Sequence, residues 1–129
     1  MVWTVIATAL VLFMFLVLGA LVSQARGKYG VPAPATTGNP AFERVYRVHQ
    51  NTAEQLIVFL PSLWMFAFTV SHWGAALLAL VFIAGRVIYA RSYYADASKR
   101  SAGFVIALLA TLILMVGSVI GVLVHALQS

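Results

Sequence analysis

The amino-acid sequence predicts an all-α integral membrane protein built as a four-helix bundle. Of its 129 residues, 63% are hydrophobic and only 9% are charged, a composition unlike that of soluble domains. Four long apolar runs can each cross a hydrocarbon core about 30 Å thick. Backbone groups in lipid must be paired internally, and the runs lack the alternation of barrel strands, so helices are expected. The expected spans are roughly residues 2–23, 41–70, 74–93 and 102–127, in a single domain covering residues 1–129.

The first apolar run has a second interpretation as a cleaved signal peptide. Residues 23–25 read Ser-Gln-Ala, which resembles a cleavage site. However, no Lys or Arg precedes the run, and it exceeds the usual apolar region of about 7–15 residues. We therefore expect a retained membrane helix.

Basic residues are concentrated on one side of the expected bundle. The connection after the first span, with the start of the second, carries Arg26, Lys28, Arg44 and Arg47. The connection before the fourth span carries Arg91, Lys99 and Arg100. Because basic loops stay on the cytoplasmic side, both long connections are expected in the cytoplasm and both termini across the membrane. The short termini and the absence of a basic leader favour a bacterial inner membrane over the endoplasmic reticulum.

Charge and residue inventory exclude several kinds of site. The net charge of +5 needs no nucleic-acid partner, and its concentration on one membrane face suits an anionic lipid or ligand. The chain has no Cys, which excludes disulfides, thiolate metal sites and a Cys nucleophile. Its three His residues (49, 72 and 125) have no metal-ligand spacing, so no metal is expected.

The segment 24–40 is expected to be the one long connection, because it is rich in Gly and Pro. A structureless stretch of this length in so small a protein indicates either a flexible connector or a loop at the edge of a functional site. At its end, Asn39 followed by Pro40 predicts the start of a helix, with Asn as the cap and Pro in the first turn.

The second span carries its polar side chains in one stripe. Each residue of an α-helix advances about 100° around the axis, so Arg47 falls at about 300° relative to Arg44. On the same scale Asn51 and Glu54 fall at about 340° and 280°, within one face about 80° wide. His49, at about 140°, faces away.

The third span presents a comparable stripe. Relative to Arg86, Tyr89 falls at about 300° and Tyr93 at about 340°. Both stripes lie toward the cytoplasmic ends of their helices, so they can face one another, with Arg100 just beyond. The simplest interpretation is anchoring: cations at helix ends extend to lipid phosphates, and tyrosines sit at the interface.

Glu54 and Arg86 do not fit that interpretation well. Each lies about two turns inside its span, where an ionised group costs ~2–3 kcal/mol. They could form a structural ion pair with each other. Even so, arginines on the same faces would lack a carboxylate, because the chain has only three acidic residues.

The surplus of arginine predicts an anionic ligand that also carries an amine for Glu54. Arg binds carboxylates through two parallel hydrogen bonds, and a carboxylate side chain pairs with an ammonium group. Glutathione, with two carboxylates, one ammonium and a thiol, has this pattern. A dicarboxylic peptide or a phospholipid headgroup would satisfy the same charges.

The stretch TTGNPAFERVYRVHQNTAE (residues 36–54) resembles the MAPEG family, the membrane-associated proteins in eicosanoid and glutathione metabolism. Within it, the resemblance is to the branch of microsomal glutathione transferases and leukotriene-C-forming synthases. It is carried by FERVYR followed by Asn51 and Glu54, and extends in length and four-helix layout over nearly the whole chain.

The resemblance implies a homotrimer with glutathione, as cosubstrate, bound between neighbouring subunits and open toward the cytoplasm. Carried over position by position, the glutathione-binding residues are Arg26, Arg44, Arg47, Asn51, Glu54, Arg86, Tyr89 and Tyr93. Arg100 matches the arginine that family members place against the sulfur, and it is the expected catalytic residue.

The activity so implied is transfer of glutathione to hydrophobic electrophiles that arrive from the bilayer, a detoxification reaction. A guanidinium favours the thiolate of a thiol whose ordinary pKa is about 8.5, so no general base is required. The same thiolate would reduce lipid hydroperoxides, which adds a peroxidase activity to the expectation.

The chain departs from the family pattern at three positions. Gln55 stands where relatives often carry Tyr, His49 replaces a common Gln, and Gly27 replaces a basic residue. These changes bear on affinity and substrate range.

Two alternatives have other functions. A non-catalytic lipid-presenting member of the family lacks equivalents of Arg47 and Glu54. A small multidrug transporter needs an unneutralised carboxylate, whereas Glu54 shares its face with arginines.

Overall fold

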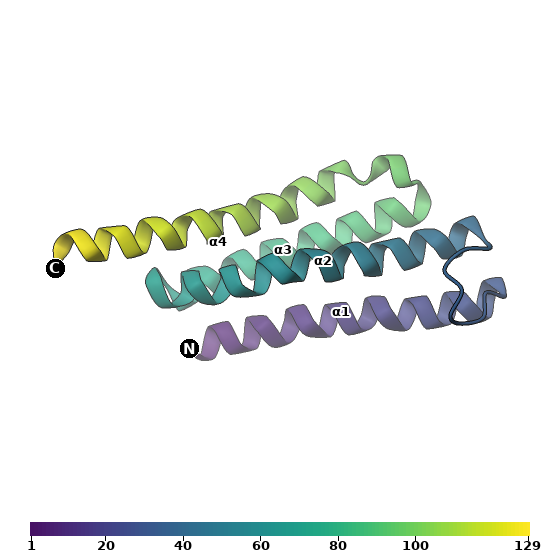
Figure 1. The fold of residues 1–129 in the computed structure, drawn as a ribbon, viewed down its shortest axis with the longest axis horizontal. Helices are drawn as coiled ribbons and strands as arrows, with labels where there is room; N and C mark the ends of the chain where they lie inside the picture. The colour runs from purple at the N-terminus through teal and green to yellow at the C-terminus, as the bar shows by residue number, and fades with distance from the viewer.

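The structure, a computed structural model, describes residues 1–129, and its regular secondary structure is all helical, as predicted. Its elements are α1 (Val2–Tyr29), α2 (Pro40–Thr69), α3 (His72–Ala95), the short 3-10 helix η1 (Ala97–Lys99) and α4 (Ser101–Gln128). The four long helices lie side by side along the long axis (Figure 1), and α1 and α4 each pack against both α2 and α3. Both termini lie at one end, and the connections that carry the basic residues lie at the other. We call the latter the basic end.

Helix α1 is longer than the sequence predicted. It continues past Ser23 to Tyr29, and Gly30 ends it in the left-handed conformation (φ 66°), with its N–H bonded to the Arg26 carbonyl. The apolar run stops near Ser23, but the residues that follow include the good helix formers Gln, Ala, Arg and Lys. Hydropathy marks where a helix leaves the lipid rather than where it ends. The irregular connection is therefore residues 30–39 and not 24–40.

Helix α2 begins as predicted. The Asn39 side chain accepts hydrogen bonds from the backbone N–H groups of Ala41 (2.9 Å) and Phe42 (3.1 Å), and Pro40 occupies the first turn. The helix has 30 residues and is about 45 Å long at 1.5 Å per residue. Since the hydrocarbon core is about 30 Å thick, roughly ten residues extend beyond it. Measured from the Thr69 end, the core boundary falls near Gln50, so Asn51 and Glu54 lie just inside it.

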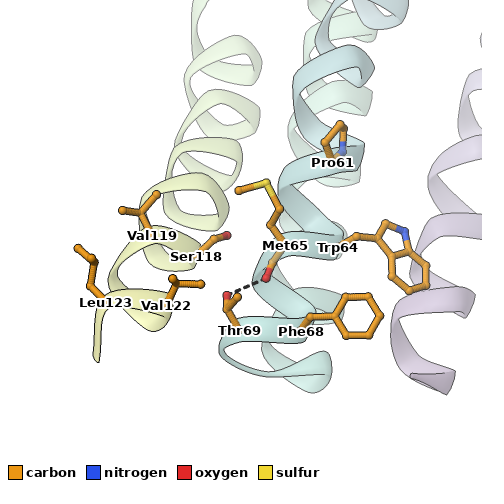
Figure 2. A pocket seen from close by; sticks show the side chains of 9 residues that line it. All are labelled: Pro61, Trp64, Met65, Phe68, Thr69, Ser118, Val119, Val122 and Leu123. Carbon is orange, nitrogen blue, oxygen red and sulfur yellow. Dashed lines mark hydrogen bonds between the residues drawn. The ribbon is translucent and has the colours of Figure 1, made fainter. Parts of the chain in front are cut away.

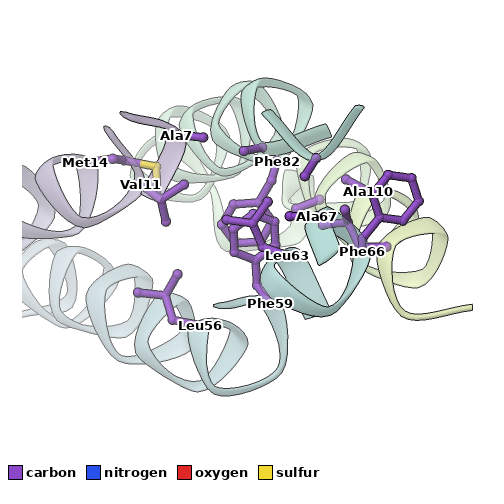
Figure 3. Packing of buried hydrophobic residues seen from close by; sticks show 14 residues of the cluster. Ala7, Val11, Met14, Leu56, Phe59, Leu63, Phe66, Ala67, Phe82 and Ala110 are labelled. Carbon is purple, nitrogen blue, oxygen red and sulfur yellow. The ribbon is translucent and has the colours of Figure 1, made fainter. Parts of the chain in front are cut away.

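A hydrophobic cluster of 14 buried residues holds the four helices together (Figure 3). At its centre the rings of Phe59 on α2 and Phe82 on α3 stack with centroids 3.8 Å apart. The cluster takes its α2 residues from Leu56 onward and its α3 residues up to Phe82. Nearer the basic end, polar side chains occupy the space between α2 and α3.

Two glycines bring α3 and α4 into backbone contact. A Cβ on Gly85 would lie 2.7 Å from the backbone nitrogen of Ala107, and a Cβ on Gly103 would overlap the backbone of Tyr89. This contact fixes the start of α4, and with it Arg100, close to Tyr89 and Arg86.

The outer surface of the bundle is apolar. All four long helices are long and apolar enough to cross a membrane. Large side chains are exposed on every one of them, among them Leu16 (69% exposed), Ile57 (74%) and Leu109 (53%). Such a surface requires lipid or other protein around it, so the chain is an integral, multi-pass membrane protein.

Candidate functional site

A buried arginine lies between α2 and α3 without a carboxylate partner. Arg86 is only 1% exposed. Its Nη2 and Nε donate to the Thr52 hydroxyl at 2.8 and 3.3 Å, and its Cζ lies 4.0 Å from the centre of the Tyr89 ring. The Thr52 hydroxyl in turn donates to the Val48 carbonyl at 2.7 Å. The alternative of an ion pair between Arg86 and Glu54 is not what the structure contains, since Arg86 bonds to Thr52 and Glu54 is exposed.

Arg86 forms the inner wall of a polar pocket of about 240 Å³, which we call the Arg86 pocket. Seven residues line it: Asn51, Glu54, Gln55, Arg86, Tyr89, Arg100 and Phe104. The Asn51 amide donates to the Tyr89 hydroxyl at 2.7 Å, which leaves the phenolic proton free to donate to a ligand. Five of the residues predicted from the sequence thus meet around one pocket, which α2, α3 and the start of α4 enclose.

A second polar pocket, of about 510 Å³, lies one helical turn closer to the basic end. Its lining includes Arg44, Arg47 and Tyr93, and we call it the Arg47 pocket. The Tyr89 and Tyr93 rings, one from each pocket, have centroids 5.5 Å apart, so the two pockets adjoin along α3. The Arg44 Nε donates to the Tyr94 carbonyl at 3.0 Å, whereas Arg47 is exposed.

The charges of the two pockets leave a small positive excess. Together the pockets contain four arginines (44, 47, 86 and 100) and all three acidic residues of the chain, a difference of one charge. Two of the acids are engaged locally: Glu43 accepts from the Gly38 N–H at 3.4 Å, and Asp96 accepts from both the backbone N–H and the hydroxyl of Ser98. Those bonds from Ser98 hold the pKa of Asp96 below its ordinary value. Glu54 is left as the carboxylate free for a ligand.

Arg100 stands at the outer edge of the Arg86 pocket, at the N-terminus of α4. Its Nη1 donates to the Ala97 carbonyl at 2.8 Å. The side chain is exposed, and its other N–H groups have no acceptor in the protein. A guanidinium in this position can meet a negative group held in the pocket.

Arg26 is the one predicted site residue that the chain does not bring to these pockets. It lies in the last turn of α1, where Nη1 donates to the carbonyls of Ala35 (2.6 Å) and Val31 (3.3 Å). Its Cζ lies 4.9 Å from the centre of the Phe42 ring. Within one chain, therefore, Arg26 orders the connection between α1 and α2.

Thr52 is the residue that the stripe on α2 did not identify. It falls about 80° from Arg44 around the helix axis, in the direction away from Glu54, and so lies outside the stripe. A buried β-branched hydroxyl beside Asn51 is a weak signal, because such a group can bond to its own helix backbone, as Thr52 does. Only the position of Arg86 on the neighbouring helix shows that the Thr52 hydroxyl also accepts hydrogen bonds from that guanidinium. His49, predicted to face away, does so: its ring stacks on Phe15 of α1 with centroids 4.5 Å apart.

A larger cavity of about 580 Å³ lies at the opposite end of the bundle, between α2 and α4 (Figure 2). Its lining has no ionisable side chain. The Thr69 and Ser118 hydroxyls donate to the carbonyls of Met65 and Leu114 in their own helices. This cavity has nothing with which to hold a charged ligand, and no group of three or more His, Cys, Asp or Glu residues lies together anywhere in the chain to hold a metal.

Comparison with known proteins agrees with the four-helix architecture. The sequence model of the MAPEG family matches residues 2–120. An uncharacterized protein of Synechocystis is 49% identical over 121 residues, which cover 94% of this chain and 88% of that protein. Human microsomal glutathione S-transferase 2 is 45% identical over 83 residues, covering 64% of this chain and 56% of the human protein. Bovine leukotriene C4 synthase is 35% identical over 108 residues, covering 84% and 72%. The chain is therefore a member of the MAPEG family of membrane proteins.

Proposed function

We propose that this protein is a membrane glutathione S-transferase, with glutathione bound in the Arg86 and Arg47 pockets. The observation that carries the proposal is Arg86, a buried cation with no carboxylate, in a pocket that also offers Glu54, Asn51 and Tyr89. Glutathione at neutral pH carries one net negative charge, which complements the single positive excess of the two pockets. Relatives named as glutathione S-transferase and leukotriene C4 synthase support the same assignment.

The binding roles follow from the chemistry of each group. Arg47 and Arg86 engage the two carboxylates of glutathione, and the exposed Glu54 engages the ammonium group. Asn51 holds Tyr89 so that its hydroxyl proton points to the ligand. Arg44 and Tyr93 complete the wall near the basic end. The spacing of the two adjoining pockets suits an extended peptide better than a single compact anion.

Arg100 is the proposed catalytic residue. Its unpaired N–H groups stabilise the glutathione thiolate and so lower the pKa of the thiol, each unit being worth about 1.4 kcal/mol. The released proton goes to solvent at the exposed pocket edge. The thiolate then attacks an electrophilic carbon: a C–S bond forms, and the leaving group departs with its bonding electrons.

The second substrate is a hydrophobic electrophile that enters from the bilayer, which surrounds the apolar outer surface. The same thiolate attacks the terminal oxygen of a lipid hydroperoxide: the O–O bond breaks, a glutathione sulfenic acid forms, and the released alkoxide takes a proton from solvent to give the alcohol. A second glutathione converts the sulfenic acid to the disulfide and water. The proposal therefore includes peroxidase activity.

The proposed assembly is a homotrimer with its sites at subunit boundaries. Arg26 does not reach the pockets of its own chain, and Glu54 and Arg100 are exposed at the pocket edge. A neighbouring subunit that supplies Arg26 would close the site. The proposed orientation has the basic end in the cytoplasm, where glutathione is abundant, and a bacterial inner membrane as the location.

The test is conjugation by the purified protein reconstituted in liposomes. With glutathione and chlorodinitrobenzene we expect formation of the aryl conjugate, with a rate that saturates in glutathione. The matched comparison is the Arg86→Met variant, which keeps an unbranched side chain without the cation. Its conjugation rate should be low and should show little saturation as the glutathione concentration rises. A wild-type protein that binds lipids but gives no conjugate and no hydroperoxide reduction would instead have the lipid-presenting function.

A further inference from the structure

A third pocket lies between the end of α1, the start of α2 and the end of α3. Its volume is about 260 Å³, and we call it the Tyr94 pocket. It shares only Arg44 with the Arg47 pocket and no residue with the Arg86 pocket. The proposed transferase reaction uses none of its other side chains.

Tyr94 lines this pocket, and its buried hydroxyl lacks a hydrogen-bond partner. It is the only buried side-chain nitrogen or oxygen atom in the chain without one. Buried polar groups are nearly always paired, and an unpaired one calls for a missing partner. A phenolic O–H donates one hydrogen bond, so an acceptor on a ligand would satisfy it.

The charged groups at the pocket are both cations. Its lining includes Lys28 and Arg44 and no acidic residue. The Lys28 Nζ lies 5.3 Å from the centre of the Tyr29 ring. Arg44 uses its Nε on the Tyr94 carbonyl, which leaves its terminal nitrogens available. Two cations and one unpaired O–H in one small pocket match an anion with several acceptor oxygens.

The position of the pocket adds an apolar component. Lys28 is in the last turn of α1, at the basic end, and the side chains of Ala25 and Leu21 lie about one and two turns deeper along the same helix, respectively. Val45 of α2 lines the same apolar side. The pocket is thus cationic at the level of lipid headgroups and apolar toward the membrane core.

We propose that the Tyr94 pocket binds the phosphate group of an anionic phospholipid from the leaflet at the basic end. The Tyr94 hydroxyl and the two cations bind phosphate oxygens, and the upper part of an acyl chain lies along Leu21 and Ala25. Basic groups near a membrane surface attract anionic lipid. Here the unpaired hydroxyl, placed beside two cations and an apolar wall, converts that attraction into a defined site.

The experiment measures binding of short-chain lipids to the delipidated protein in a nonionic detergent. Dihexanoyl phosphatidylglycerol should bind in a saturable manner, and dihexanoyl phosphatidylcholine should bind more weakly. The Tyr94→Phe and Lys28→Gln variants should each weaken phosphatidylglycerol binding about tenfold, as expected for loss of one hydrogen bond to a charged group. The matched controls are Tyr46→Phe and Arg91→Gln, which alter a tyrosine and a cation outside the pocket and should stay within about twofold of wild type.

Three results would overturn the proposal. Glycerol 3-phosphate that binds as tightly as the lipid would identify a soluble phosphate as the ligand. Full displacement of the lipid by glutathione would assign the pocket to the glutathione site. Unchanged lipid binding in both pocket variants, with an altered oligomeric state, would mean that a neighbouring subunit supplies the partner of Tyr94.

Discussion

The Arg86 guanidinium is fixed by the Thr52 hydroxyl, with Nη2 and Oγ1 2.8 Å apart, and not by a carboxylate. Thr52 is fully buried and itself donates to the Val48 carbonyl. One neutral side chain thus orients a buried cation while leaving its charge unneutralised. An anionic ligand finds the arginine in place and does not have to displace an internal carboxylate.

Replacing Thr52 by Val should lower both the stability of the bundle and its affinity for glutathione. Val has the shape of Thr but cannot accept a hydrogen bond, so a buried guanidinium loses its acceptor at a cost of about 1–2 kcal/mol. We expect a lower melting temperature in detergent and a glutathione dissociation constant raised about tenfold. The Thr52→Ser variant keeps the hydroxyl and is the control. Equal glutathione affinity in the Val variant and wild type would show that Thr52 does not position Arg86 for the ligand.

Removing the Arg100 guanidinium should change the chemistry more than the binding. In Arg100→Ala the bound thiol loses its stabilising cation, so its pKa returns toward about 8.5 and the thiolate fraction at neutral pH falls. The conjugation rate should drop at pH 7 and recover as the pH rises, since a thiol with a higher pKa ionises only at higher pH. Arg100→Lys keeps the charge and should retain more of the neutral-pH rate.

The pH profile of conjugation and a separate glutathione titration distinguish the two roles of Arg100. A large loss of affinity with an unchanged pH profile would make Arg100 a carboxylate-binding residue. It would then have no part in activating the sulfur.

Glu54 should contribute to ligand binding only when the ligand carries an amino group. Glu54→Gln keeps the size of the side chain but removes its charge, so glutathione should bind about tenfold more weakly, the loss expected for one charge-assisted hydrogen bond. A glutathione analogue without the amino group should bind the variant and the wild type equally. Calorimetric titration of both ligands checks this. Equal losses for the two ligands would reject the pairing of Glu54 with the ammonium group.

The backbone contact between α3 and α4 should control both stability and activity. A methyl group at Gly103 overlaps the Tyr89 backbone, so Gly103→Ala should destabilise the bundle by about 1–3 kcal/mol, as overpacking does. It should also slow conjugation, because α4 carries Arg100 away from Tyr89. A methyl group at Gly27 would meet no atom within 4 Å, and Gly27→Ala inside α1 should be neutral or stabilising by about 0.5–1 kcal/mol. Thermal unfolding that gave the reverse order would contradict this packing.

The fold was predictable because lipid imposes strong rules on a sequence. Apolar length alone located four helices, and the Asn39-Pro40 pair located the start of α2 to the residue. The end of α1 was not predictable from hydropathy, because residues 24–29 are polar and still helical. Helix ends outside the hydrocarbon core depend on propensity and capping, which a hydropathy profile does not include.

The candidate site was predictable where one helix face carried it. The stripe on α2 and the stripe on α3 meet as their periodicity indicated, and Asn51 bonds to Tyr89. Two features depended on three-dimensional detail. Arg26 is turned to the carbonyls of Val31 and Ala35, and Thr52 gains its role only from the side chain that reaches it from α3. Spacing along one helix carries neither kind of information.

The proposed glutathione site is tested most directly by equilibrium binding of glutathione to the purified wild-type protein in detergent, followed by calorimetry and by ultraviolet absorbance of the thiolate. We expect saturable binding, release of a proton into the buffer at neutral pH, and a thiolate signal that Arg100→Ala abolishes. Absence of binding at millimolar glutathione, with the protein folded and its oligomeric state intact, would contradict the proposed site.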